Sequence, residues 1–430
     1  MANIVKRVVI EKLYDNYDYD ITFDKNGVTL ITGPNGYGKT TLLNIIKNAL
    51  GLNFWYFYEL LFSSITIYFD VKESAKLVIK RSLSKKNNPM ADEADDYKIS
   101  IAFYLNNNRK ALERYSYDSY DYRRYREFYP SAYLRHGGIT IEDEISDLPM
   151  RFRERYEYEV RQNFRNYRMF VNDKNCLFIK EQRIFSTKKG DDEGEDKYTI
   201  TQLALDLKKK YADQKSHYTD EGQKIDSSFI QRLLSKEQTV YNEKEYLKRV
   251  NELNKYVDAY KQFGLISNLG FIGEYKEDFK TALTLYIEDM FKKIAVYDDF
   301  YRQLSLFNRF VNGKVLSNKK MILNEKEGIS FESDSGRSVP LHKLSSGEQN
   351  LVILYYRLVF ETEPNTLLLI DEPENSLHVE WLEKMLRDYL VMESDLKCQM
   401  IIATHSPIFI GDNWEIAYDL CGGSYQDRME

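Results

Sequence analysis

Roughly the first hundred residues of the chain carry short apolar or alternating runs. Side chains of a strand alternate between the two faces of a sheet, so six of these runs predict β-strands, mostly antiparallel. The runs are IVKRVVIEKL (4–13), DITFD (20–24), VTLITG (28–33), SITIYFDV (64–71), AKLVIKRS (75–82) and YKISIAFYL (97–105). One helix is expected among them, TLLNIIKNAL (41–50), because its apolar residues recur at helical spacing directly after a glycine-rich turn.

Helical patterns dominate the middle of the chain. Residues 107–175 are polar and helix-compatible, 176–185 predict a buried strand followed by a loop, and 186–197 have the charge density of a solvated loop. From 198 to 310 the chain looks helical, and one segment has the four-three spacing of a short coiled coil. Its seam is Tyr246, Val250, Leu253, Val257 and Tyr260, with Leu203, Leu207 and Tyr211 as the candidate partner stripe. The alternative is an ordinary amphipathic helix packed on the body.

The remaining third of the chain alternates strands and helices. A hairpin is predicted over 319–333, a helix from Gly347, a strand over 366–370, a helix over 376–390 and a strand from 399. Such alternation is typical of an α/β layer.

The composition is that of a soluble globular protein, with 43% hydrophobic and 30% charged residues. A net charge of −6 argues against a generally basic nucleic-acid coat, which leaves DNA contact to a local patch such as the tyrosine- and arginine-rich stretch 114–133. General compositional bias is the other explanation of that stretch. No run approaches the roughly 18 apolar residues that span a bilayer, and no signal-peptide core is present. Three scattered cysteines, Cys176, Cys398 and Cys421, form no disulfide framework, so we expect a cytoplasmic protein without membrane contact.

Residues 33–40 spell G-x-x-x-x-G-K-T between a predicted strand and a predicted helix, the context that a phosphate-binding loop requires. Backbone N–H groups of the turn and of the helix N-terminus would surround the phosphates. Lys39 would reach the β and γ phosphates, and Thr40 would bind Mg²⁺. The expected ATP contacts are Gly33, Pro34, Asn35, Gly36, Gly38, Lys39, Thr40 and Thr41.

Polar residues at three predicted strand ends complete the expected chemistry. Ligands of open α/β sheets lie outside the carboxyl ends of the strands. We therefore expect Asp371 to hold Mg²⁺ through water and Glu372 to accept a proton from the attacking water. His405 is expected to bond the γ-phosphate. Gln182 would link Mg²⁺ and the attacking water to the inserted region.

A second anion site is predicted in LSSGEQN (344–350), where Ser345, Ser346, Gly347 and Glu348 open a helix. This site has no metal ligand of its own. Two phosphate sites of different kind in one chain suggest that one copy completes the pocket of another.

Five motifs follow one another along the chain: the phosphate loop 33–40, a glutamine loop at Gln182, a signature loop at 344–350, the Asp371-Glu372 strand end and a switch histidine, His405. In this order they resemble the ABC-type ATPase heads of the Rad50, RecF and OLD group. The resemblance covers roughly 1–80, 175–185 and 310–412. It implies an α/β head, made of a mixed antiparallel lobe and an α/β lobe, with an inserted helical region that includes a short coiled coil. The expected segments are 1–106 (N-terminal part of the head), 107–175 (helical lobe), 176–197 (glutamine-loop strand and loop), 198–310 (helical insertion) and 311–430 (C-terminal part of the head).

The resemblance also implies a head-to-tail dimer around ATP. The sequence DEPENSLH (371–378) is similar to the OLD and RecF version, which implies a contact across the dimer by Asn375, Ser376 or His378. The signature has Ser346 in place of a glycine, and Glu348 where transporters have glutamine, a change that is usual in Rad50-like heads. For the adenine, the candidates are Lys12 and Tyr14.

The insertion is too short for the long arms of chromosome-structuring proteins. The chain continues for only about 25 residues after His405, so we expect no OLD-type nuclease domain, and any cutting falls to a partner. A stand-alone ATPase of this size resembles the ATPase subunits of the PARIS-type and Septu-type two-gene anti-phage systems. That implies a homodimer that builds higher homo-oligomers and restrains a separately encoded effector, a nuclease, until a phage-encoded trigger is sensed. A RecF- or Rad50-like DNA repair or recombination ATPase is the alternative, followed by a transporter ATPase and a non-hydrolysing structural module.

Overall fold

The computed structural model divides into two compact units. The structure describes residues 5–23, 27–70, 74–83, 97–106, 108–119, 121, 160, 162–171, 176–180, 185–186, 197–235, 240–266, 274–314, 316 and 318–424. Unit 1 comprises Met1–Arg183, Thr187–Glu195 and Glu361–Glu430, and unit 2 comprises Ile184–Ser186 and Asp196–Phe360. The glycine-rich loop and the Asp-Glu pair therefore belong to unit 1, whereas the signature segment belongs to unit 2.

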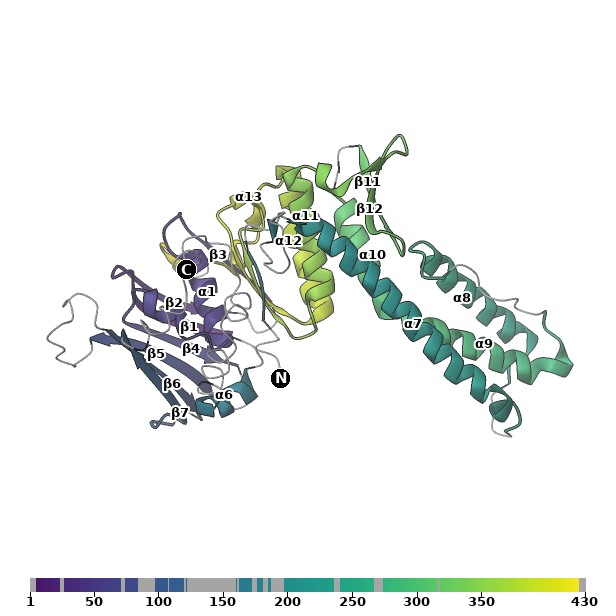
Figure 1. Ribbon diagram of the computed structural model, residues 1–430, viewed down its shortest axis with the longest axis horizontal. Helices are drawn as coiled ribbons and strands as arrows, with labels where there is room; N and C mark the ends of the chain where they lie inside the picture. The colour runs from purple at the N-terminus through teal and green to yellow at the C-terminus, as the bar shows by residue number, and fades with distance from the viewer. Residues whose placement is uncertain are drawn as a thin grey trace. The chain divides into compact units, whose positions relative to one another are not determined.

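Unit 1 contains an antiparallel sheet, drawn in Figure 1, whose two faces differ in polarity. Buried and half-exposed residues alternate along β4 and β6, as expected for strands covered on one side. The six strands lie in the order β2 (Tyr17–Thr22), β1 (Val5–Leu13), β4 (Ser64–Phe69), β5 (Ala75–Leu83), β6 (Tyr97–Leu105) and β7 (Glu113–Asp118).

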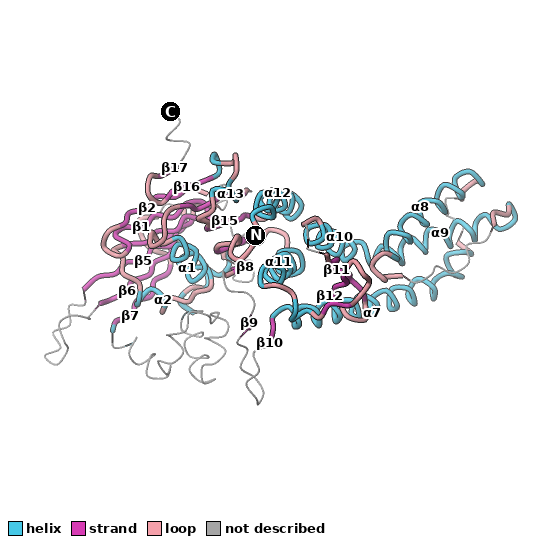
Figure 2. The backbone as a smooth tube through the Cα atoms, turned by 90° about the horizontal axis from the view of Figure 1, so that it is seen from above, coloured by secondary structure: helices cyan, strands magenta, loops and turns pink. Residues whose placement is uncertain are grey.

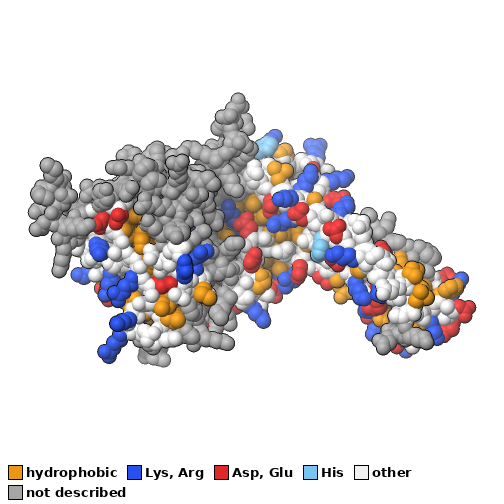
Figure 3. Space-filling view, turned by 60° about the horizontal axis from the view of Figure 1, so that its bottom comes forward, with side chains coloured by type: hydrophobic (Ala, Val, Ile, Leu, Met, Phe, Trp, Pro, Cys, Tyr) orange, Lys and Arg blue, Asp and Glu red, His pale blue; other side chains and the backbone are white. Residues whose placement is uncertain are grey.

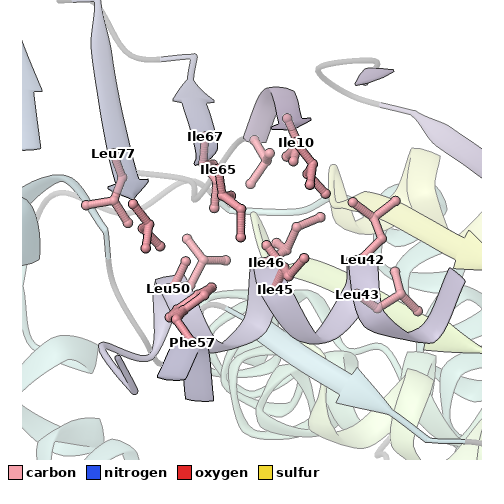
Figure 4. Close-up of a cluster of buried hydrophobic side chains, with 14 of the residues drawn as sticks. Ile10, Leu42, Leu43, Ile45, Ile46, Leu50, Phe57, Ile65, Ile67 and Leu77 are labelled. Carbon is pink, nitrogen blue, oxygen red and sulfur yellow. The ribbon is translucent and has the colours of Figure 1, made fainter. Parts of the chain in front are cut away.

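Helix α1 (Lys39–Leu50) packs on the apolar face of this sheet. Figure 4 shows Ile46 and Leu50 of α1 facing Ile65 of β4 and Leu77 of β5, all of them buried. Burying an aliphatic side chain stabilises a fold by about 1.5–3 kcal/mol. The packing therefore fixes the start of α1, and with it the glycine-rich loop. Unit 1 also contains α2 (Tyr56–Glu59), α6 (Arg165–Phe170), α12 (Val379–Leu396), α13 (Pro407–Ile410) and a short 3₁₀ turn, η6 (Trp414–Ile416).

The second sheet of unit 1 is mainly parallel. Its six strands lie in the order β17 (Gly423–Ser424), β16 (Ala417–Asp419), β3 (Val28–Thr32), β15 (Gln399–Ala403), β14 (Leu367–Asp371) and β8 (Cys176–Ile179). Only the β16–β17 pair is antiparallel among these described strands. Every residue of β14 and β15 is buried, as in sheets covered on both faces. The carboxyl ends of β3, β14 and β15 meet at one edge.

The predicted α/β fold is confirmed, and two local predictions within it were wrong. Residues Glu113–Asp118, in a stretch with a helix-compatible pattern, form strand β7 because they pair with β6. Helix α12 begins at Val379 rather than 376, because Ser376 has a left-handed backbone (φ 61°) and His378 is the N-cap.

Unit 2 is built from helices, a hairpin and the helix that follows the signature residues. Its helices are α7 (Thr199–Leu233), α8 (Glu243–Lys261), α9 (Lys280–Ile294), α10 (Asp298–Asn312) and α11 (Ser346–Tyr356), joined by 3₁₀ turns η2 (Glu277–Phe279), η3 (Ala295–Tyr297) and η4 (Leu341–Lys343) and followed by a π-helical turn (Arg357–Glu361). Its strands are β9 (Phe185–Ser186), β10 (Lys197–Tyr198), β11 (Lys319–Asn324), β12 (Gly328–Ser333) and β13 (Ser338–Val339). Figure 2 shows the predicted hairpin β11–β12 between α7 and α10. Within the described residues, every helix is too short or too polar to cross a membrane.

The predicted seam of α8 is largely buried, but its predicted partner was wrong. Tyr246 and Tyr260 cluster with Ile287 of α9. Tyr211, from the expected partner stripe, instead meets Phe300 of α10, with ring centroids 5.0 Å apart. The 35 residues of α7 span about 50 Å at 1.5 Å per residue. The stripe lies in its first turns, whereas α8 and α9 lie alongside its far end (Figure 1).

Candidate nucleotide-binding site

The loop 33–38 joins the carboxyl end of β3 to the N-terminus of α1. Gly38 is the N-cap of α1, with a φ of 85°, a backbone conformation that glycine adopts without steric strain. No side chain caps the helix, and its first turn contains no acidic residue. The free N–H groups and the positive end of the helix dipole therefore form an anion site.

The Lys39 ammonium lies inside this loop. Its Nζ donates to the carbonyl oxygens of Gly33, at 2.8 Å, and Pro34, at 3.3 Å, and the residue is only 6% exposed. Phosphate oxygens would compete well for this ammonium, because charged acceptors make stronger hydrogen bonds than neutral carbonyls. Asn35 and Gly36 are exposed at the tip of the loop, so a phosphate chain has access to it.

Thr40 and Asp371 bring the loop and the acidic strand end together. Thr40 Oγ1 donates to Asp371 Oδ1 at 3.1 Å, across the junction of α1 and β14. A hydroxyl and a carboxylate suit Mg²⁺, which usually takes one or two protein carboxylates and completes its shell with water and phosphate oxygens. The described residues contain no cluster of three or more His, Cys, Asp or Glu side chains that would hold a metal alone. The pair therefore fits a Mg²⁺ ion that arrives with a nucleotide.

Glu372 and His405 face each other at the ends of β14 and β15. Glu372 Oε1 lies 3.4 Å from His405 Nδ1. The Glu372 backbone has a φ of 43°, unusual for a residue with a side chain, and its N–H donates to Ala403 O at 2.9 Å. His405 is half exposed. The strand pairing thus holds a carboxylate and an imidazole beside the phosphate loop.

Glu374 belongs to the same cluster and was missed by the sequence analysis. Its Oε1 accepts from Thr404 Oγ1 at 2.6 Å and from His405 N at 2.9 Å, and lies 3.4 Å from His405 Nδ1. Glu374 follows the expected Asp371-Glu372 pair by two residues and is buried. The sequence did offer one signal: Glu374 and the pair Thr404-His405 each follow a predicted strand, and neighbouring strands would bring them together.

The signature residues open α11 in unit 2. Ser345 is the N-cap in a capping box with Glu348, and both Ser345 and Ser346 are exposed, while Gly347 is half-buried. Glu348 is buried, and both of its oxygens lie 2.8 Å from Lys319 Nζ. Burial alone would raise the pKa of Glu348, but Lys319 and Ser345 outweigh it and hold the pKa below its ordinary value. Glu348 therefore holds Ser345 in place through the Ser345 N–H and hydroxyl, and Ser346 beside it is exposed to solvent.

Among the other predicted contacts, Gln182 lies outside the described residues. Ser376 and His378 are exposed, and Asn375 is half-buried. Of the two adenine candidates, Tyr14 has a contact with the first turn of α1. Its hydroxyl is 2.8 Å from Thr41 Oγ1, which places the ring beside the first turn of α1.

A protein family described as "AAA domain, putative AbiEii toxin, Type IV TA system" matches residues 28–411. The matched span includes the glycine-rich loop, the signature segment, the Asp-Glu pair and His405. No curated protein matches the chain.

Several solved structures cover nearly the whole chain at low identity. An SmcHead bound to the C-winged helix domain of ScpA is 12% identical over 95% of this chain and 91% of its own, with a TM-score of 0.40. An Smc head domain with an extended coiled coil, bound to the C-terminal domain of ScpA and derived from Pyrococcus furiosus, is 13% identical over 95% and 91%, with a TM-score of 0.37. The SMC head domain from Thermotoga maritima is 14% identical over 96% and 94%, with a TM-score of 0.37. Values this low say nothing of what this chain binds.

Proposed function

Because the chain belongs to the family described as "AAA domain, putative AbiEii toxin, Type IV TA system", we propose that it binds ATP with Mg²⁺ in unit 1 and hydrolyses it. The contact of Thr40 Oγ1 with Asp371 Oδ1, at 3.1 Å, carries this proposal. It places a hydroxyl and a carboxylate together at the entrance of a helix N-terminus that is open to phosphates. Both are oxygen ligands of the kind that Mg²⁺ prefers.

The remaining side chains of the cluster have complementary roles. Lys39 offsets the charge of the phosphates, and Glu372 accepts a proton from the attacking water. His405 donates a hydrogen bond to the γ-phosphate. Bound Mg²⁺ would supply further stabilisation of the charge on the phosphates.

We further propose that two copies assemble head to tail, so that Ser345 and Ser346 of one chain complete the ATP site of the other. The exposed N-terminus of α11 supports this role. Ser345 and Ser346 are exposed there, and Glu348 holds Ser345 from within by accepting from its N–H and hydroxyl while it pairs with Lys319.

Mixing two inactive variants tests this sharing. Lys39→Ala and Ser346→Arg should each abolish turnover alone, and their mixture should regain measurable ATPase activity. In the mixed dimer one site combines an intact phosphate loop with an intact signature, while the other site carries both lesions. Turnover is followed by phosphate release, after tagged chains have shown that subunits exchange.

Ser335→Arg is the matched control, because Ser335 is another exposed serine of unit 2, on the β12–β13 turn. It should remain active alone. A mixture of the two inactive variants that exchanges subunits yet stays inactive argues against independent shared sites.

We also propose that the ATPase acts in anti-phage defence, as a cytoplasmic sensor and scaffold that restrains a separately encoded nuclease. A higher homo-oligomer of the dimers would hold this effector until a phage-encoded trigger is sensed. The resemblance to ATPase subunits of two-gene defence systems supports this role, as does a family description that names a toxin–antitoxin system.

Phage challenge of cells that carry the native locus tests the defence role. The wild-type locus should lower the plating efficiency of a sensitive phage, and Lys39→Ala or removal of the neighbouring effector gene should restore it. Lys47→Ala is the control, because Lys47 lies in the last turn of the same helix. Protection that persists in the Lys39→Ala strain would contradict a nucleotide-dependent sensor.

A second candidate function, a DNA repair or recombination ATPase, is favoured by the polar face of the antiparallel sheet. A hollow of about 350 Å³ there is lined by Arg7, Lys76, Tyr68 and Tyr104 together with Asp70, and Arg7 is itself paired with Asp20. The Lys76 ammonium lies 5.9 Å from the ring centre of Tyr68 and 5.4 Å from that of Tyr104. On the part of unit 1 that Figure 3 colours, Lys and Arg side chains lie among hydrophobic and other side chains. If this function is the right one, a strain that lacks the gene should be sensitive to DNA damage and should not become more sensitive to phage.

A further inference from the structure

Glu374 ties together the two chain segments that carry the reacting side chains. It lies in the turn between β14 and α12, three residues after Asp371. Through Oε1 it accepts from Thr404 Oγ1 at 2.6 Å and from the backbone N–H of His405 at 2.9 Å. The backbone on which His405 stands is therefore held from the neighbouring strand end by this carboxylate.

One ring nitrogen of His405 lies near two carboxylates. Its Nδ1 is 3.4 Å from Glu374 Oε1 and 3.4 Å from Glu372 Oε1. A carboxylate oxygen only accepts hydrogen bonds, so the favourable arrangement places a proton on Nδ1. The Nδ1 edge of the ring therefore faces the two carboxylates, and Nε2 is the nitrogen available to a ligand.

The Glu374 side chain is almost fully buried. It is 4% exposed, and among the described residues its Oε2 has no hydrogen-bond partner. A buried, partly unpaired carboxylate is costlier than a neutral amide of the same shape. Within the described part of the chain, the basic side chain at ion-pair distance from it is His405. The charge of Glu374 is therefore explained best by an action on that imidazole.

We propose that Glu374 is a positioning residue that keeps the His405 imidazole in place during ATP hydrolysis. This rests on the ATPase function proposed above. Glu372 loses its negative charge when it accepts a proton from the attacking water, and its attraction to the imidazole then weakens. Glu374 has no part in this proton transfer, so it keeps its charge beside His405 Nδ1. His405 thus keeps its orientation toward the γ-phosphate through the step that neutralises Glu372.

Replacement of Glu374 by glutamine tests the role of its charge. Gln keeps the length of the side chain and an oxygen that accepts from Thr404 and His405 N. We expect the Glu374→Gln chain to bind ATP with unchanged Kd and to lose on the order of tenfold in kcat, the effect of one hydrogen bond to a charged group. The signals of His405 in a chain labelled with ¹⁵N-histidine should shift, and His405→Asn identifies those signals among the five histidines.

Glu113→Gln is the matched control. Glu113 is a buried glutamate of the same unit that accepts from the backbone N–H groups of Asn166, at 2.6 Å, and Tyr167, at 2.9 Å, and it is no part of the nucleotide site. We expect this variant to leave kcat and the His405 signals unchanged.

Each result decides the proposal. Wild-type kcat together with unchanged His405 signals in Glu374→Gln would overturn it, and so would an equal loss of kcat in Glu113→Gln, which would indicate a structural role only. If the wild-type chain itself fails to hydrolyse ATP, the proposed ATPase function is wrong. In that case the histidine signals still report whether Glu374 orients the ring.

Discussion

Lys39→Ala is expected to lower ATP affinity on the order of 100-fold, because it removes the ammonium that the loop carbonyls of Gly33 and Pro34 hold at 2.8 and 3.3 Å. Hydrogen bonds from a charged donor to phosphate oxygens are among the strongest in proteins. The fold should survive, because Ala is a good helix former at the first position of α1. Isothermal titration calorimetry with ATP and Mg²⁺ measures the loss.

Lys47→Ala again provides the control, since it removes a lysine from the other end of the same helix. Its ammonium lies 5.2 Å from the ring centre of Phe178, away from the glycine-rich loop. It should bind ATP as the wild type does. Near-normal affinity in Lys39→Ala would show that the nucleotide pocket has been assigned to the wrong loop.

Glu372→Gln should keep ATP affinity and lower turnover by roughly 100-fold or more, the effect of losing a general base. Gln has the same shape, so the left-handed backbone at this position (φ 43°) and the N–H contact to Ala403 are retained. Because ATP is bound but not consumed, the variant should accumulate as a dimer in its presence. Phosphate release gives the rate, and light scattering gives the mass.

Glu383→Gln serves as the control for Glu372→Gln, because Glu383 is an exposed glutamate on α12. It should show wild-type turnover and no trapped dimer. A monomeric Glu372→Gln chain at saturating ATP is the outcome that contradicts completion of the site by a second copy.

Much of the fold was predictable because strand ends carry local signals. The apolar runs before Gly33, Asp371 and His405 each end at a polar residue, and parallel strands place such residues at one edge of a sheet. The start of α11 also carries a local signal. Ser345 followed three residues later by Glu348 is the pattern of a capping box, and the structure contains this box.

The remaining features depend on contacts between distant segments. The salt bridge of Lys319 with Glu348 joins a hairpin to a helix start, and no local pattern distinguishes Lys319 from its exposed neighbour Lys320. The buried state of Glu374 likewise depends on Thr404 of another strand. The partner of the α8 seam was missed for the same reason, because spacing along one helix identifies an apolar face but not the helix that covers it.

The strand order of the parallel sheet has a consequence for synthesis. Val28 of β3 pairs with Met400 of β15, and Leu30 pairs with Ala417 of β16. At about 5–20 residues per second, the ribosome needs roughly 20–75 s to pass from Val28 to its pairing partner Met400. Unit 2 is nearly contiguous, from Asp196 to Phe360, and has all its residues earlier. A nascent chain therefore displays its glycine-rich loop long before the neighbouring strands exist, and the strand ends of the candidate site come together only after residue 400 has left the ribosome.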